Sequence, residues 1–293
     1  MADDSKVKSF YDSVAEDYHL QYQRERMHDI TAKYPNNYIR LQILINAFLA
    51  KGTRRIIDVG VGEGTPLSLL SRMGIEAWGF DISPNMVTKA RANMKQHGLD
   101  PERVFVGDIE DPCTYAHACK GQSFDGLTAM GVMPHVQNEE RVIANMRNML
   151  TPGGSVFIEF RNELFSLFTF NRHTKDFLMN KLLRGVSDDL KASLEQELDA
   201  RLRLDMPPQP ETPDSYAAIP ARFHNPFEVQ EMFHRQGFKD IRLLWYHYHP
   251  TLPWLEAGDK AAFRREALRL EHDALNWRGM FLCSAFLVEA VKA

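Results

Sequence analysis

Three glycines separated by single residues form the most informative pattern in the sequence. They occur in the stretch DVGVGEG, which begins at Asp58 and includes Gly60, Gly62 and Gly64, at the end of the short β-branched run RIIDV at 55–59. Glycine adopts left-handed backbone conformations freely and has no side chain, so such a turn lets a ligand approach the main chain closely. We therefore expect a ligand-binding turn between a strand and the next helix.

The spacing of this turn differs from that of a dinucleotide site. Dinucleotide-binding turns have the fingerprint G-x-G-x-x-G, with helix amides facing a pyrophosphate. Here Thr65 stands where the third glycine would be, and Glu63 adds a negative charge beside the expected phosphates. Both features argue against NAD. A sulfonium nucleoside carries no phosphate and is positively charged, so an acidic turn is compatible with it.

Two more acids follow apolar runs further along the chain. Asp81, followed by Ile82, comes seventeen residues after Gly64 and can accept hydrogen bonds from both ribose hydroxyls of a nucleoside. Asp108 can accept one from an adenine amino group, while Ile109 packs on the ring. Because parallel strands end at one edge of an open α/β sheet, these residues predict a nucleoside site.

Strands and helices alternate up to residue 160. The strands are expected at residues 55–59, 77–82, 104–106, 124–129 and 155–160, with helices at 66–73, 84–97 and 139–150. Ser83 is the expected N-cap of the second helix, with Pro84 at its first position and Gly98 after its end. This order predicts an α/β fold with a doubly wound, Rossmann-like parallel sheet.

The alternation stops at residue 161, and we interpret residues 161–225 as an inserted cap. The first part, 163–204, has a helical pattern with leucines at four-residue spacing: Leu190, Leu194, Leu198 and Leu202. Residues 206–226 contain six prolines and predict a loop that becomes ordered when ligands bind.

The core pattern returns after the cap. Asn225 and Pro226 begin a helix that ends before Gly237, and then come a strand at 238–247, a helix at 260–275 and a strand at 281–291. We divide the chain into an N-terminal helical lid (1–50), a cofactor-binding core (51–160), the cap (161–225) and the C-terminal part of the core (226–293).

Taken together, these motifs resemble those of the class I S-adenosylmethionine-dependent methyltransferases, over most of residues 9–160 and the closing segment. LTPGGS at 150–155 is similar to the family's entry to the fifth strand, and FYDSVAEDY at 10–18 to its N-terminal helix. The resemblance implies S-adenosylmethionine as cofactor, with Tyr11 and Tyr18 closing over it. It also implies a mostly parallel sheet of seven strands with an antiparallel last strand.

By the same resemblance, residues 130–135 face the methyl acceptor, with Met130 beside the cofactor and Met133 beside the acceptor. His135 is the candidate general base, because the pKa of imidazole lies near neutrality. The alternative is a histidine that caps or orients the start of a helix.

Three polar residues leave the fifth strand and are the remaining acceptor-binding candidates: Glu159, Arg161 and Asn162. They could equally form ion pairs that seal the cap. The phenylalanines of the cap, Phe165, Phe168, Phe170 and Phe177, are interpreted first as core and second as an apolar wall for the acceptor.

A metal site is the weaker interpretation of the pair His247 and His249. Alternation along a strand would put both imidazoles on one face, but two ligands do not make a site. We expect no metal.

The composition narrows the classes of partner and compartment. With 35 basic against 39 acidic residues, the chain has no basic field for nucleic acid. Its most apolar stretch, 281–288, is far shorter than a membrane-spanning helix, and the first ten residues have no apolar signal core. Three cysteines without a CxxC pair agree with a reducing compartment. We expect a cytoplasmic enzyme that methylates a small molecule at oxygen or nitrogen. The alternatives are an NAD-dependent oxidoreductase and a non-catalytic cofactor-binding relative.

Overall fold

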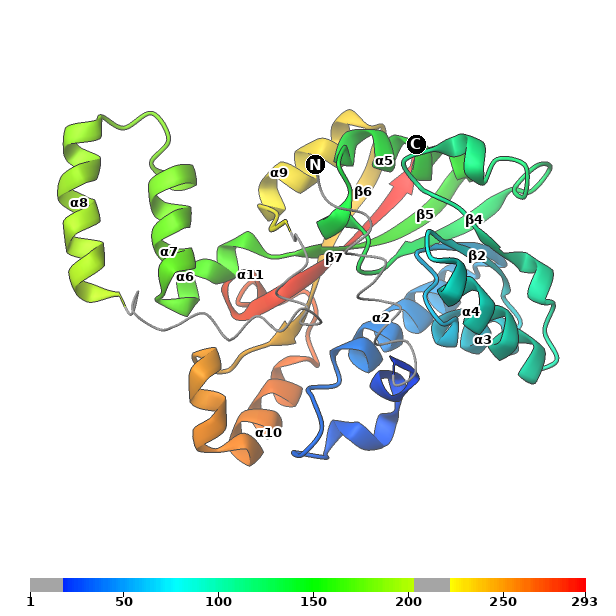
Figure 1. Ribbon diagram of the computed structural model, residues 1–293, viewed down its shortest axis with the longest axis horizontal. Helices are drawn as coiled ribbons and strands as arrows, with labels where there is room; N and C mark the ends of the chain where they lie inside the picture. The colour runs from blue at the N-terminus through cyan, green and yellow to red at the C-terminus, as the bar shows by residue number, and fades with distance from the viewer. Residues whose placement is uncertain (1–17, 203–221) are drawn as a thin grey trace.

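One seven-stranded sheet organises the protein (Figure 1). The computed structural model describes residues 18–202 and 222–293. The strands are β1 (Arg55–Val59), β2 (Glu76–Asp81), β3 (Val104–Val106), β4 (Phe124–Ala129), β5 (Leu150–Arg161), β6 (Phe238–Tyr248) and β7 (Cys283–Lys292). Their order across the sheet is β3-β2-β1-β4-β5-β7-β6, and only β7 runs antiparallel to its neighbours. The predicted Rossmann-like sheet with an antiparallel last strand is confirmed.

Helices cover both faces of the sheet (Figure 1). Those on one face are α2 (Asn36–Lys51), α3 (Thr65–Arg72) and α4 (Pro84–Gln96), and those on the other are α5 (Glu139–Met149) and α9 (Pro226–Arg235). Their apolar sides meet strands that are buried on both faces, which is the usual state of strands in a doubly wound sheet. No helix in the described ranges is both long and apolar enough to cross a membrane.

Two predicted helix starts are confirmed by their capping bonds. The Ser83 hydroxyl accepts a hydrogen bond from the Met86 N–H at 3.2 Å, and the Asn225 side chain accepts one from the Phe227 N–H at 3.1 Å. Each cap satisfies a backbone donor that the first helical turn leaves without a partner.

The sequence placed some boundaries wrongly. The helix expected at 260–275 ends earlier, as α10 (Lys260–Leu270), and the last strand begins at Cys283 because a short helix, α11 (Gly279–Leu282), precedes it. Helix α2, assigned to the lid, buries Leu41, Leu44 and Phe48 against the sheet. This helix therefore forms a layer of the core.

The cap contains α6 (Ser166–Thr169), α7 (Arg172–Phe177) and α8 (Asp188–Arg201), and α7 and α8 project from the sheet (Figure 1). Helix α8 buries none of its residues, and Leu190 is 66% exposed. Leu194, Leu198 and Leu202 are only partly buried, and α8 also contacts α7 through ion pairs of Lys175.

The phenylalanines of the cap differ from one another in burial. Phe177 is buried, Phe165 and Phe168 are partly buried, and Phe170 is 48% exposed, so the expectation of core holds fully for Phe177 alone. Most of the predicted proline-rich loop, 206–221, lies outside the described residues.

Candidate functional site

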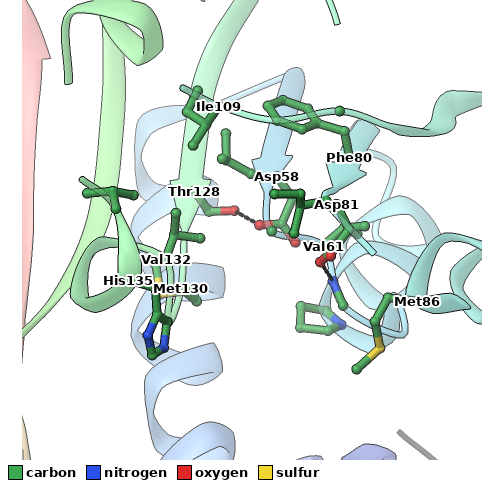
Figure 2. Close-up of a pocket in the computed structure, with 18 of the residues that line it drawn as sticks. Asp58, Val61, Phe80, Asp81, Met86, Ile109, Thr128, Met130, Val132 and His135 are labelled. Atoms are coloured by element: carbon green, nitrogen blue, oxygen red, sulfur yellow. Dashed lines mark hydrogen bonds between the residues drawn. The ribbon is translucent and has the colours of Figure 1, made fainter. Parts of the chain in front are cut away.

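A cavity of about 160 Å³ opens where β1, β2, β3 and β4 end (Figure 2). This is the edge at which open α/β sheets bind ligands. The predicted site residues that line it are Asp58, Gly60, Gly62, Asp81, Ile82, Asp108, Ile109, Met130 and His135.

The glycine turn is bonded to the neighbouring strand. The N–H groups of Gly60 and Val61 both donate to the Phe80 carbonyl, at 2.8 and 3.0 Å. Gly60 has a φ of +73°, and a Cβ atom on it would lie 2.6 Å from Cγ2 of Val132. A side chain at this position would therefore be strained and would also collide with the cavity wall. Gly64 does not line the cavity but precedes α3 as its N-cap.

Asp81 is held by two main-chain donors while it faces the cavity. Its Oδ2 accepts the Gly62 N–H and its Oδ1 accepts the Ser83 N–H, both at 2.9 Å. A carboxylate oxygen has further lone pairs, so these bonds orient the group and still permit it to accept ribose hydroxyls. Asp108 and the buried side chain of Ile109 follow β3 on the same side of the cavity.

Glu63 turns away from the cavity. It is buried, and its carboxylate accepts bonds from the backbone N–H and the hydroxyl of Thr65, at 3.3 and 2.9 Å. The negative charge predicted beside a phosphate therefore occupies the first turn of α3. This position disfavours a dinucleotide further, because the carboxylate of Glu63 already occupies the helix N-terminus that would bind the pyrophosphate.

Asp58 lines the cavity and has a neutral, a positive and a negative neighbour, namely Thr128, Arg40 and Asp81. The Thr128 hydroxyl donates to its Oδ1 at 2.6 Å, and Arg40 from α2 is close enough to stabilise its charge. Burial nevertheless raises the pKa of Asp58 to about 7, against the influence of Thr128 and Arg40. A bound cation would favour the ionised carboxylate.

The wall on the β4 side is largely apolar. Met130, Val132 and Val136 line it together with His135, which ends the short helix Met133–His135. Figure 2 shows His135 on the same side as Met130 and Val132, away from Asp81 and Met86. Met133 points elsewhere, since it is completely buried in the core and does not line the cavity.

The three acceptor candidates from β5 do not line this cavity. Glu159 is buried and accepts bonds from Arg40 and Tyr246. Asn162 donates to the carbonyls of Met280 and Cys283, both at 2.8 Å, so its amide ties β5 to the segment that enters β7. The guanidinium of Arg161 lies 5.8 Å from the ring centre of Phe223.

The sequence missed several lining residues, including Tyr22, Arg40, Leu44 and Thr128. No short motif marks them. The sequence does carry one signal for Arg40, which is a charged residue between the apolar Ile39 and Leu41. In the structure Arg40 is only 5% exposed. Tyr11 and the side chain of Tyr18 lie outside the described residues.

His247, near the end of β6, and His249, which follows the strand, have ring centres 4.8 Å apart. Burial lowers their pKa values to about 4 and about 3, so both rings are neutral at pH 7. His247 is bonded through Nδ1 to the Ser284 hydroxyl at 2.8 Å. Within the described residues, no three His, Cys, Asp or Glu side chains form a metal-binding group.

Comparisons with known proteins agree with this geometry. Residues 57–158 match the family described as a methyltransferase domain. A ubiquinone biosynthesis O-methyltransferase of Azoarcus sp. (strain BH72) is 28% identical over 203 residues, 69% of this chain and 82% of the relative. One of Coxiella burnetii (strain Dugway 5J108-111) is 24% identical over 214 residues, 73% and 75% of the two chains.

Solved structures show the same architecture. A methyltransferase of Thermotoga maritima, described as a possible histamine N-methyltransferase, has a TM-score of 0.53 at 15% identity, over 97% of this chain and 99% of that one. Magnesium protoporphyrin IX methyltransferase from Synechocystis PCC 6803, solved with S-adenosylhomocysteine, has a TM-score of 0.53 at 13% identity, over 99% and 100%.

The fold thus places the chain among the Rossmann-like α/β proteins, with an acid-lined glycine turn at the edge of the sheet where the parallel strands end. The matched methyltransferase domain identifies the chain further as a class I S-adenosylmethionine-dependent methyltransferase. It is an enzyme, its cofactor is S-adenosylmethionine, and the oxidoreductase and non-catalytic alternatives are set aside.

Proposed function

We propose that the enzyme methylates a hydroxyl oxygen of a small, largely apolar molecule and that His135 removes the hydroxyl proton. The observation that carries this proposal is the position of His135, the imidazole in the apolar wall formed by Met130, Val132 and Val136 (Figure 2). The O-methyltransferase names of the Azoarcus and Coxiella relatives support an oxygen acceptor.

The cavity residues fit the nucleoside part of the cofactor. Asp81, already oriented by two main-chain donors, accepts the ribose hydroxyls. Asp108 accepts the adenine amino group, and Ile82 and Ile109 flank the ring. The space at Gly60, which a Cβ atom would fill, admits the cofactor close to the main chain.

The amino-acid tail of the cofactor then extends over β1 and β4. Asp58 interacts with its ammonium group, and Arg40 with its carboxylate. The support for this is charge: both side chains line the cavity and lie near one another, as the effect of Arg40 on the pKa of Asp58 indicates. A charged hydrogen bond of either kind contributes about 1.5–3 kcal/mol to binding.

S-adenosylmethionine supplies a methyl group bonded to a positively charged sulfur. The task of the protein is to hold the acceptor oxygen behind that methyl carbon, in line for displacement. The apolar wall excludes water from the attacking oxygen, and His135 accepts its proton as the new bond forms. The methyl group passes to oxygen, and the sulfonium becomes a neutral thioether.

The remaining expectations are part of the same proposal. Arg161 contacts the acceptor or seals the cap, and the enzyme acts in the cytoplasm without a nucleic-acid partner. The net charge of −4 supports the last point. The bonds of Glu159 and Asn162 support a structural role for both.

The test replaces His135. A cell extract incubated with methyl-labelled cofactor first identifies the product by mass spectrometry. His135→Asn should then lower turnover of that acceptor by ~10²-fold or more, remove the acidic limb of the pH profile and leave S-adenosylhomocysteine affinity intact. His97→Asn, an exposed histidine at the end of α4, is the control that keeps full activity. Near-normal turnover of His135→Asn with an unchanged pH profile would reject the general base.

A further inference from the structure

A buried polar network connects the cofactor cavity to the far strands of the sheet. Arg40 on α2 donates through Nη1 to Oε2 of Glu159 on β5, and the Tyr246 hydroxyl on β6 donates to the other oxygen of the same carboxylate. The side chains of Arg40 and Glu159 are 7% and 12% exposed, and Tyr246 is completely buried. Of the three, only Arg40 lines the cavity.

Stability alone is a weak reason for such a network. A buried ion pair loses the hydration of two charges, and a well-packed apolar pair of similar size often serves the fold equally well. Both carboxylate oxygens of Glu159 accept hydrogen bonds from the protein itself. Arg40 belongs both to this network, through its bond to Glu159, and to the lining of the cavity, and it therefore connects the two.

We propose that Glu159 and Tyr246 are positioning residues that hold the guanidinium of Arg40 for the carboxylate of the cofactor's amino-acid tail. This inference rests on the part of the proposed function that assigns Arg40 to the tail. Glu159 orients the guanidinium with an anion, and Tyr246 fixes the carboxylate of Glu159 in turn. Glu159 and Tyr246 lie on two strands of one sheet. They can therefore hold the long and otherwise flexible side chain of Arg40 in one rotamer.

Two probes isolate the tail. S-adenosylhomocysteine contains it, and 5′-methylthioadenosine has the same nucleoside and sulfur without the amino-acid group. A residue that acts through Arg40 on the tail changes the affinity of the first and leaves that of the second unchanged. Isothermal titration calorimetry on the full chain measures both dissociation constants.

We expect Glu159→Gln to weaken S-adenosylhomocysteine binding by ~10-fold, the scale of one misplaced charged hydrogen bond, and to change methylthioadenosine binding by less than ~2-fold. Tyr246→Phe keeps the ion pair and should act in the same direction by ~3-fold, so it tests the inference even if Glu159→Gln does not fold. The matched controls are Glu289→Gln, a buried glutamate paired with Arg242, and Tyr248→Phe, a buried tyrosine on the same strand. Neither control residue lines the cavity, and neither variant should alter the ratio of the two affinities.

Equal weakening of both probes by Glu159→Gln and Tyr246→Phe, or no weakening of either, would overturn the positioning role. Arg40→Gln separates this failure from failure of the proposed function. If Arg40→Gln selectively weakens S-adenosylhomocysteine while the other two variants do not, Arg40 binds the tail and the positioning inference is wrong. If Arg40→Gln changes neither affinity, the assignment of Arg40 to the tail is wrong as well.

Discussion

Asp81 and Glu159 both lie near the carboxyl ends of parallel strands on one edge of the sheet, yet their surroundings differ completely. Asp81, at the end of β2, faces the cavity and is held by N–H groups nineteen and two residues away in the chain. Glu159, near the end of β5, is enclosed by Arg40 and Tyr246, which are 119 and 87 residues away.

This difference shows what decides the task of an acid in such a site. Main-chain donors orient Asp81 without neutralising it, so its charge remains available to a ligand. A cation and a hydroxyl occupy both oxygens of Glu159, so its charge is used within the protein.

The largest effect is expected from Glu159→Ala. The substitution leaves the buried Arg40 without its anion, and breaking a buried pair in this way lowers the free energy of unfolding by about 3–5 kcal/mol. Urea denaturation measures the loss. Asp81→Ala is the comparison and should change stability far less, because it removes a group that accepts main-chain N–H groups and does not break the buried ion pair of Arg40. A loss below about 1 kcal/mol for Glu159→Ala would contradict the structural role.

Asp81→Ala should instead act on the cofactor. Removing a charged acceptor lowers the free energy of S-adenosylhomocysteine binding by about 1.5–3 kcal/mol, measurable by calorimetry. Asp125 offers a matched control, because it also accepts backbone N–H groups, those of Arg54 and Arg55, but does not line the cavity. If Asp81→Ala binds as tightly as Asp125→Ala, the ribose assignment is wrong.

The pH dependence of cofactor binding should report on Asp58. Its pKa of about 7 lies well above the ordinary value for an aspartate, so ionisation becomes costly to the folded protein as pH rises from about 4 to about 7. Since a bound ammonium group favours the ionised form, affinity for S-adenosylhomocysteine should increase with pH, by up to about tenfold per unit below pH 7.

Asp58→Asn should flatten this dependence. Glu271→Gln is the control: burial also raises the pKa of Glu271 to about 7, but this residue does not line the cavity. If the pH dependence of affinity survives in Asp58→Asn and disappears in Glu271→Gln, the titrating group is Glu271 and not Asp58.

The smallest effect is expected on the cap. Leu190 on α8 is 66% exposed, so Leu190→Gln should change the free energy of unfolding by less than about 0.5 kcal/mol. Leu67 on α3 is completely buried, and Leu67→Ala should lower it by about 2–5 kcal/mol. A large loss in Leu190→Gln would mean that the leucine pattern of α8 does pack against something.

Much of the cofactor-binding part of the site could be predicted from the sequence, because the residue patterns that mark it involve neighbours along the chain. The turn at Gly60 needs a positive φ, the caps Ser83 and Asn225 bond to residues two or three positions away, and Asp81 is the last residue of its strand. The acceptor half gave weaker predictions. Glu159 and Asn162 were expected to face the acceptor, but their partners come from α2, β6 and the segment before β7.

The order of strands and helices, the glycine turn and the acids beside it can be predicted from the sequence, since each depends on neighbours along the chain. Packing between distant segments places Arg40 in the cavity, Glu63 in the first turn of α3 and Met133 in the core, and it leaves α8 with no buried residue. The reason is physical. The task of a charged side chain depends on which charges and donors surround it, and at the β5 edge those groups are brought together only when distant segments pack against one sheet.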